Sequence, residues 1–258
     1  MIDLLSFPAF LLILIRVSAF FLTIPVFSNK NLPVMHKIGL SLFLSWIMLY
    51  AISPDPVPIN GFFLLLVIKE AMIGLVIGFI AAIVFYALQV AGGFIDLQMG
   101  FAIANVFDPQ TGIQTPLMGR YLYTFAMLFL LAVDGHHMLL DGIFYSYNFL
   151  PLESPIANFG NGSITKFVVS VFSGMFLVAL QMAIPIVGTL FLADLALGIV
   201  ARTVPQMNIF VIGLPVKILI ALVLFLVVMP AFFVSIQMLI EQMRDTMVNL
   251  MELLGAAS

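Results

Sequence analysis

The residues of this sequence most able to do chemistry lie close together at Asp134, His136 and His137, with Asp141 one turn further on. On one continuous helix Asp134, His137 and Asp141 would share a face, and such a face can hold a metal ion or relay a proton. The cluster offers at most three ligands, and the one other histidine is His36. There is no His-Glu-x-x-His motif and no cysteine. We therefore expect a structural or loop role for the two histidines, with no metal and no cofactor.

Motifs of other enzyme classes are also absent from the sequence. It contains no Gly-x-Ser-x-Gly, no P-loop and no dinucleotide-binding fingerprint. An intramembrane hydrolase built on Asp134 and Asp141 has no supporting motif. The nine Lys and Arg residues are scattered and the net charge is −3, so no basic face is available for nucleic acid. The sequence thus indicates neither an enzyme nor a nucleic-acid-binding protein.

The composition is that of a membrane protein. Of the 258 residues, 64% are hydrophobic and 8% are charged, whereas about 25% of the residues of an average soluble protein are charged. So few charges cannot cover a soluble globule of this size. We therefore expect an all-α integral membrane protein, since a helix satisfies its own backbone polar groups in lipid. The N-terminus has no basic region, which predicts a retained first span and not a signal peptide.

Six apolar segments are long enough to cross a membrane, since a span needs about 20 residues. They are residues 4–27, 36–52, 61–93, 121–149, 167–200 and 207–240. The third, fifth and sixth would each be about 50 Å long as helices, more than the roughly 30 Å of hydrocarbon. Each contains helix-disturbing residues, among them Gly74, Gly78, Pro185, Pro215 and Pro230. We expect about six long, partly broken helices, which form either kinked spans or bent helical hairpins inside a larger assembly.

Charged residues within the apolar segments favour the assembly. They are Arg16, Lys69, Glu70, Asp194 and Lys217. A charge at the bilayer centre costs about 2.5–3.5 kcal/mol, so such residues usually face protein or a water cavity. For Lys69 and Lys217 the alternative is that the side chain extends to an interface. Arg16 has twelve uncharged residues on each side, and we expect a partner for it. We expect these charges, together with Asp96, to be buried and to serve assembly.

Residues 96–120 form an unusual connection between the third and fourth segments. They mix apolar side chains with glycines, several amides and the pair Asp108-Pro109. This composition indicates irregular backbone that lines a cavity or pore. The alternative is an interfacial loop that dips into the lipid headgroups.

Residues 241–258 predict an amphipathic helix at the end of the chain. Its apolar side chains fall on one face, namely Met243, Met247, Leu250, Met251 and Leu254. We expect this helix to lie on a membrane or on a partner.

Several motifs, in their order and spacing along the chain, resemble the FliR/SctT family of type III export-gate membrane proteins. They are Arg16-Val17-Ser18-Ala19, Pro25-Val26-Phe27, residues 93–101, Phe107-Asp108-Pro109, residues 205–210 and residues 213–217. The resemblance implies a non-enzymatic subunit of the flagellar type III export gate in the bacterial inner membrane, at the flagellar basal body. It also implies FliP and FliQ as partners in the channel for unfolded flagellar subunits, and FlhB and FlhA as neighbours.

The resemblance further implies roles for parts of the chain. Residues 1–166 correspond to a FliP-like part, and residues 167–240 to a FliQ-like hairpin with Pro205, Gln206 and Pro215 as turn residues. The loop at about 101–116 corresponds to a plug of the closed pore, with Phe107 as its apolar stopper. The other residues of this plug are Phe101, Val106, Asp108, Pro109 and Gly112.

A stand-alone proton- or ion-coupled secondary transporter is the alternative function. Its relay groups would be Lys69, Glu70, Asp96 and Asp194. Transporters commonly have two related multi-span halves. The sequence has only a short internal echo, in which Asp-Leu-x-x-Gly begins at Asp96 and again at Asp194.

Overall fold

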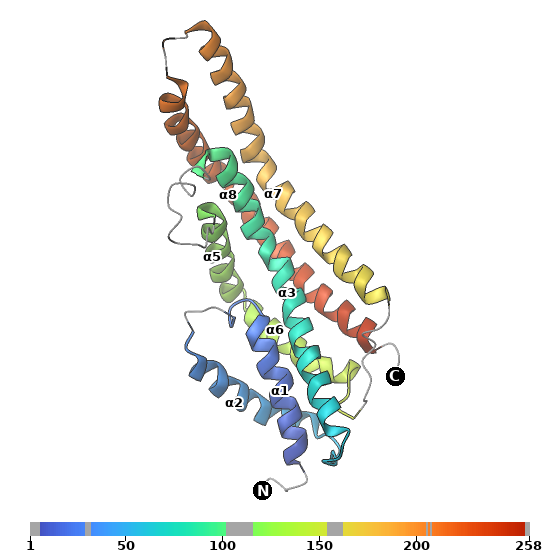
Figure 1. The fold of residues 1–258 in the computed structure, drawn as a ribbon. Helices are drawn as coiled ribbons and strands as arrows, with labels where there is room; N and C mark the ends of the chain where they lie inside the picture. The colour runs from blue at the N-terminus through green and yellow to red at the C-terminus, as the bar shows by residue number, and fades with distance from the viewer. Residues whose placement is uncertain are drawn as a thin grey trace. The chain divides into compact units, whose positions relative to one another are not determined.

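The computed structural model describes residues 6–28, 32–101, 116–153, 162–204, 206 and 208–255. Over these residues the secondary structure is helical, without strands, which confirms the all-α prediction. The helices are α1 (Phe7–Thr23), α2 (Val34–Ile52), α3 (Phe63–Met99), α5 (Leu117–Ala132), α6 (Gly135–Phe149), α7 (Gly162–Thr203) and α8 (Ile209–Gly255) (Figure 1).

Several of these helices fit a multi-pass membrane protein. Among the described residues, four helices (α2, α3, α7 and α8) are long and apolar enough to cross a membrane. The count is five if α5 and α6, which meet at a bend of 76°, form one broken span. The first predicted segment is the shorter apolar helix α1, with 17 residues.

The glycines and prolines do not interrupt the helices where the sequence suggested. The helix α3 runs through Gly74 and Gly78, α7 runs through Pro185, and α8 runs through Pro215 and Pro230. Pro215 is therefore inside a helix and is not a turn residue of the hairpin. Proline is tolerated within helices of membrane proteins because neighbouring groups satisfy the freed backbone carbonyls.

The break that does occur lies within the predicted segment 121–149. Asp134 has a left-handed backbone conformation, with φ of 56°, and α6 begins at the next residue. The pair Asp134-Gly135 is a common turn signal, so a local signal for this break was present in the sequence.

The chain divides into two compact units. Unit 1 contains Met1–Phe85, Leu130–Phe172 and Ile240–Ser258, and unit 2 contains Tyr86–Phe129 and Ser173–Leu239. The core of unit 1 is formed by fully buried apolar side chains of α1 and of the first part of α3, including Leu12, Ile13, Phe20, Ile73 and Ile77. In unit 2, the adjoining parts of α7 and α8 form a helical hairpin, with Gln206 in the turn (Figure 1).

The amphipathic stretch at the C-terminus is the last part of α8 and not a separate helix. Its predicted apolar face is buried within unit 1, where Met243, Met247 and Leu250 are at most 1% exposed. Part of this face packs against α6: a methyl group added at Gly142 would come within 2.5 Å of Met247 Cε. The face predicted to meet a membrane or a partner therefore meets the chain's own helix.

Candidate functional site

The contact between α1 and α3 depends on two glycines spaced four residues apart. A Cβ atom at Gly74 would lie 2.2 Å from the backbone oxygen of Arg16, and one at Gly78 would lie 2.1 Å from Thr23 Oγ1. Small residues at this spacing let two helix backbones approach closely. The close approach places Arg16, in the middle of α1, beside the turn of α3 that carries Lys69 and Glu70.

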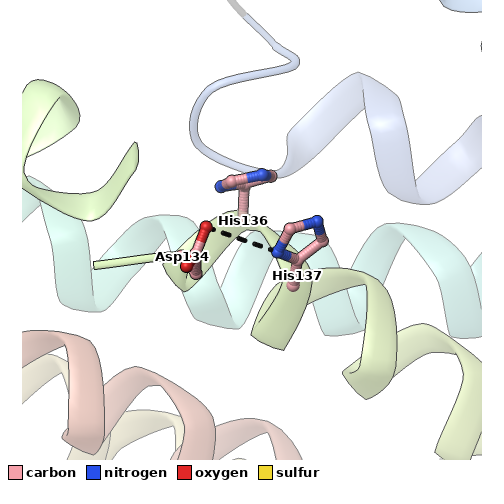
Figure 2. A group of neighbouring side chains, drawn as sticks. All are labelled: Asp134, His136 and His137. Carbon is pink, nitrogen blue, oxygen red and sulfur yellow. Dashed lines mark ion pairs between the residues drawn. The ribbon is translucent and has the colours of Figure 1, made fainter. Parts of the chain in front are cut away.

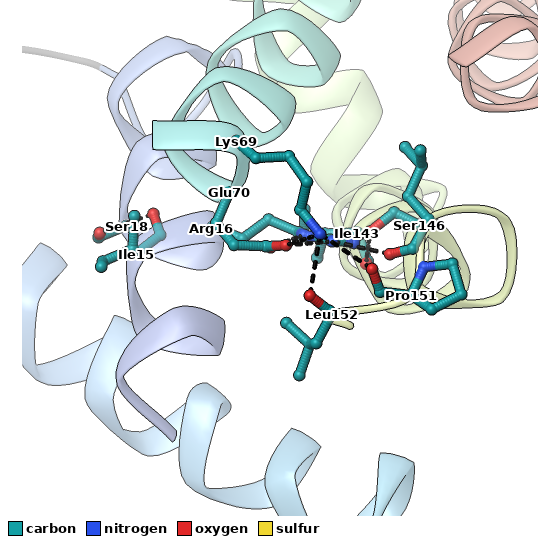
Figure 3. A network of polar contacts seen from close by, with 10 residues as sticks. Ile15, Arg16, Ser18, Lys69, Glu70, Ile143, Ser146, Pro151 and Leu152 are labelled. Carbon is teal, nitrogen blue, oxygen red and sulfur yellow. Dashed lines mark hydrogen bonds and ion pairs between the residues drawn. The ribbon is translucent and has the colours of Figure 1, made fainter. Parts of the chain in front are cut away.

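Arg16 and Glu70 form a fully buried, two-pronged ion pair (Figure 3). Arg16 Nε donates to Glu70 Oε2, and Nη2 donates to Glu70 Oε1 at 2.9 Å. The remaining donors reach the end of α6, since Nη1 donates to Ser146 Oγ at 2.9 Å and Nη2 to the Leu150 carbonyl oxygen at 2.8 Å. The guanidinium also lies 3.9 Å from the centre of the Tyr147 ring, a cation–π contact.

Lys69 is the second cation of this network. Its Nζ lies 2.9 Å from Glu70 Oε1 and donates to the carbonyl oxygens of Pro151 and Leu152 at 2.9 and 3.0 Å (Figure 3). The residue is 6% exposed, so its side chain does not extend to an interface. Three oxygen atoms thus surround an ammonium group that has three N–H donors.

The buried ion network, defined as Arg16, Lys69 and Glu70, connects three separate stretches of unit 1. They are α1, α3 and residues 146–152 at and after the end of α6. A buried ion pair adds little to the stability of a fold compared with apolar side chains in the same place. The loss of one partner, however, is strongly destabilising because it leaves an uncompensated buried charge. Each cation of the network therefore depends on partners from another segment.

A second polar cluster lies in unit 2. Lys217 Nζ on α8 lies 2.9 Å from both carboxylate oxygens of Asp194 on α7, and Gln98 Nε2 on α3 donates to Asp194 Oδ2 at 2.8 Å. The side chain of Lys217 is 16% exposed and that of Asp194 is 39% exposed. Lys217 is thus paired within the chain and does not extend alone to an interface.

Asp96 is buried, unlike Asp194 and Lys217, which are partly exposed although burial was predicted for them. Its Oδ2 accepts the backbone N–H of Met118 at 2.9 Å, in the first turn of α5. The same helices touch where a Cβ at Gly92 would lie 2.1 Å from the Cα of Gly119. Asp96 therefore belongs to α3 and holds the start of α5. The predicted connection 96–120 is shorter than expected, since α3 continues to Met99 and α5 begins at Leu117.

Most of the predicted plug lies outside the described residues. Val106, Phe107, Asp108, Pro109 and Gly112 fall in 102–115, and Pro205 in the α7–α8 turn is also outside. Phe101 is described and is half-buried. The plug role and the assembly role of the buried charges stay predictions.

The cluster around Asp134 differs from the one expected on a continuous helix. Because the chain bends at Asp134, the residues that gather are Asp134, His136 and His137, and not Asp141 (Figure 2). Asp134 Oδ1 lies 3.6 Å from His137 Nδ1, and both side chains are more than 60% exposed. A solvated contact between these side chains needs no metal ion to account for it.

Two contributions to the buried ion network were missed by sequence reasoning. One is the pair Ser146 and Tyr147, and the other is the set of carbonyl oxygens at 150–152. A backbone oxygen has no sequence signal. The spacing of Gly74 and Gly78 is present in the sequence, where it predicts a disturbed helix, whereas in the structure it forms a packing face.

The described helices, and the ion network buried between them, define an all-α, multi-span membrane protein. The family described as bacterial export proteins, family 1, matches residues 7–243. The chain is 49% identical to flagellar biosynthetic protein FliR of Bacillus subtilis (strain 168) over 252 residues, which cover 97% of each chain.

More distant relatives extend the comparison. The chain is 32% identical over 219 residues to flagellar biosynthetic protein FliR of Escherichia coli (strain K12), with 84% of this chain and 82% of the relative covered. It is 32% identical over 233 residues to Yop proteins translocation protein T of Yersinia pestis, with 87% and 88% covered. The chain therefore belongs to family 1 of the bacterial export proteins, the FliR/SctT family that its motifs predicted.

Proposed function

We propose that this protein is a non-enzymatic subunit of the flagellar type III protein export gate. The observation that carries the proposal is its near full-length similarity to a flagellar biosynthetic protein FliR, 49% identical over 97% of both chains. The similarity to a translocation protein of Yersinia pestis supports the broader role in type III export. In this proposal the protein resides in the bacterial inner membrane, at the flagellar basal body.

The lengths of α7 and α8 support a role inside a larger assembly. With 42 and 47 residues, they are about 63 and 70 Å long at about 1.5 Å per residue, and a bilayer core is about 30 Å thick. Large exposed apolar side chains extend along α7 from Val169 to Val200, and along α8 from Val211 to Met238. Each exposed stretch is about 40 Å or longer. Lipid covers a stretch of this length only if the helix tilts steeply, so we expect other protein subunits to cover part of it.

The subunits proposed for this role are FliP and FliQ, which would form the export channel together with this chain. FlhB and FlhA are the proposed neighbours, and unfolded flagellar subunits are the proposed cargo. The division into a FliP-like part (1–166) and a FliQ-like hairpin (167–240) is part of this proposal. It concerns likeness to other proteins, whereas the two compact units reflect packing within the chain.

The residues 102–115 are proposed to plug the closed pore, with Phe107 as the apolar stopper. Two described features flank these residues. Gly100, after α3, has a left-handed φ of 90° that favours glycine, and Asp96 holds the first turn of α5. Apolar constrictions close pores by excluding water.

The transporter alternative receives no such support. Its proposed relay groups belong to different compact units, with Lys69 and Glu70 in unit 1. Asp96 and Asp194 belong to unit 2. Glu70 accepts from Arg16, and Lys69 donates to two backbone carbonyl oxygens, so both residues take part in fixed contacts between segments.

Native mass spectrometry of this chain, purified with and without co-expressed FliP and FliQ from the same organism, tests the proposal. Incorporation of the chain into one large mixed complex is expected. A stable monomer or homodimer that ignores both partners would overturn the proposal and favour the transporter. Deletion of the gene provides a second test, because it should abolish secretion of flagellar subunits while their synthesis continues.

A further inference from the structure

A groove in unit 1 is lined by residues of α1 and of the N-terminal half of α2. Its volume is about 300 Å³, within the size range of small-molecule pockets. Its walls are largely apolar, with Leu14, Phe21 and Leu22 from α1 and Ile38 and Leu42 from α2. The occupant must therefore be largely apolar.

The polar groups of the groove narrow the choice of ligand. Ser18 Oγ donates to the backbone oxygen of Ile15, and Ser41 Oγ donates to that of Lys37, so each hydroxyl hydrogen is used within its own helix. The remaining polar side chain of the groove is the half-buried Lys37. Within the part of the chain that the structure describes, its ammonium group has no ion pair or hydrogen bond. The groove thus presents one positive charge beside an apolar surface.

The position of Lys37 at the start of a candidate span indicates the membrane level that its charge would have. The helix α2 is a candidate span that begins at Val34, so Lys37 is in its first turn. A lysine at the end of a span places its ammonium group at the level of the lipid headgroups. A phosphate of an anionic lipid is the negative group found at that level.

We propose that this groove binds an anionic phospholipid, with one acyl chain between α1 and α2 and the phosphate paired with Lys37. This proposal is independent of the export role, because it concerns the surface of this chain alone. A zwitterionic lipid also carries a phosphate, but its own cation competes with Lys37. The groove should therefore prefer anionic lipid.

The test is lipid binding by the full chain in detergent, measured by native mass spectrometry during titration with dioleoylphosphatidylglycerol or dioleoylphosphatidylcholine. Lys37→Gln is expected to weaken phosphatidylglycerol binding about fivefold, because a basic residue near an anionic surface contributes roughly that factor. Lys37→Arg keeps the charge and should retain binding. Lys166→Gln is the matched control, since Lys166 also lies near the start of a candidate span but is exposed.

Any one of three results would overturn the proposal. The first is equal binding of the two lipids by the unsubstituted chain. The second is unchanged phosphatidylglycerol binding by Lys37→Gln, and the third is a loss just as large in Lys166→Gln. The groove would then be assigned to an apolar segment of a protein partner.

Discussion

Arg16 and Glu70 are fully buried and face each other across the contact between α1 and α3, with two guanidinium nitrogens donating to two carboxylate oxygens. This pair is possible because Gly74, one turn beyond Glu70, has no side chain and lets α1 approach. The planar guanidinium matches a carboxylate in a way that an ammonium group cannot. The ion pair of Arg16 and Glu70 therefore depends on the close helix packing that Gly74 permits.

Replacing Glu70 with Gln should strongly destabilise the protein. The substitution leaves Arg16 and Lys69 as buried cations without an anion, a loss that costs about 3–5 kcal/mol. The measurement is thermal unfolding in detergent, followed by the fluorescence of Trp46, the one tryptophan of the chain. Glu252→Gln is the matched control because Glu252 is exposed. Equal unfolding temperatures for the two variants would contradict the prediction.

Replacing Arg16 and Glu70 together should destabilise the protein less than the sum of the two single replacements. In the variant Arg16→Met with Glu70→Met, Lys69 is the one buried cation left without an anion, whereas Glu70→Met alone leaves two, and apolar groups of similar length occupy the space. Its destabilisation should be smaller than the sum for the single variants in a double-mutant cycle. Additive losses would show that the two side chains do not depend on each other.

Replacing Gly74 with Ala should disrupt the α1–α3 contact. The new Cβ would lie 2.2 Å from the backbone oxygen of Arg16, so the helices would have to separate. Overpacking of this kind costs about 1–3 kcal/mol or more. Gly39→Ala is the control, since nothing lies within 4 Å of a Cβ there, and it should be neutral or stabilising by up to about 1 kcal/mol. Monodisperse yield in size-exclusion chromatography distinguishes the two, and equal yields would argue against close packing.

Replacing Asp96 with Ala should loosen the start of α5. The backbone N–H of Met118 would lose its acceptor inside the protein, which costs about 1–3 kcal/mol. Asp96→Asn keeps one acceptor oxygen and should lose less. The exposed Asp55 provides the control, as Asp55→Ala. Hydrogen exchange of residues 117–120 measures the effect, and unchanged protection in Asp96→Ala would refute it.

Replacing Phe107 with Ala should make the assembled export gate leak ions. The smaller side chain would widen the proposed apolar constriction and admit water. Conductance of reconstituted complexes with FliP and FliQ is the readout. Phe62→Ala, an exposed position outside residues 102–115, should leave conductance unchanged. If the complexes of both variants conduct no ions, Phe107 is not the stopper of the pore.

Much of the architecture could be predicted from composition and local pattern alone. Long apolar stretches with few charges specify helices in a membrane, because only the helix satisfies its backbone within one segment. The same reasoning identified Arg16 as a residue that needs a partner, since both of its flanks are apolar. The ordered motifs along the chain predicted the family, which the match over residues 7–243 then established.

Pairings between distant segments were decided by the tertiary structure. Glu70 became the partner of Arg16 through the glycine face of α3, and the carbonyls at 150–152 joined them only once α6 ended beside α1. The bend at Asp134 likewise separated Asp141 from the histidines. The apolar face at the end of α8 is buried, in part against α6, whereas the sequence predicts that it contacts a membrane or a partner. Local pattern determines which face of a helix is apolar, whereas the partner of that face depends on how whole helices pack.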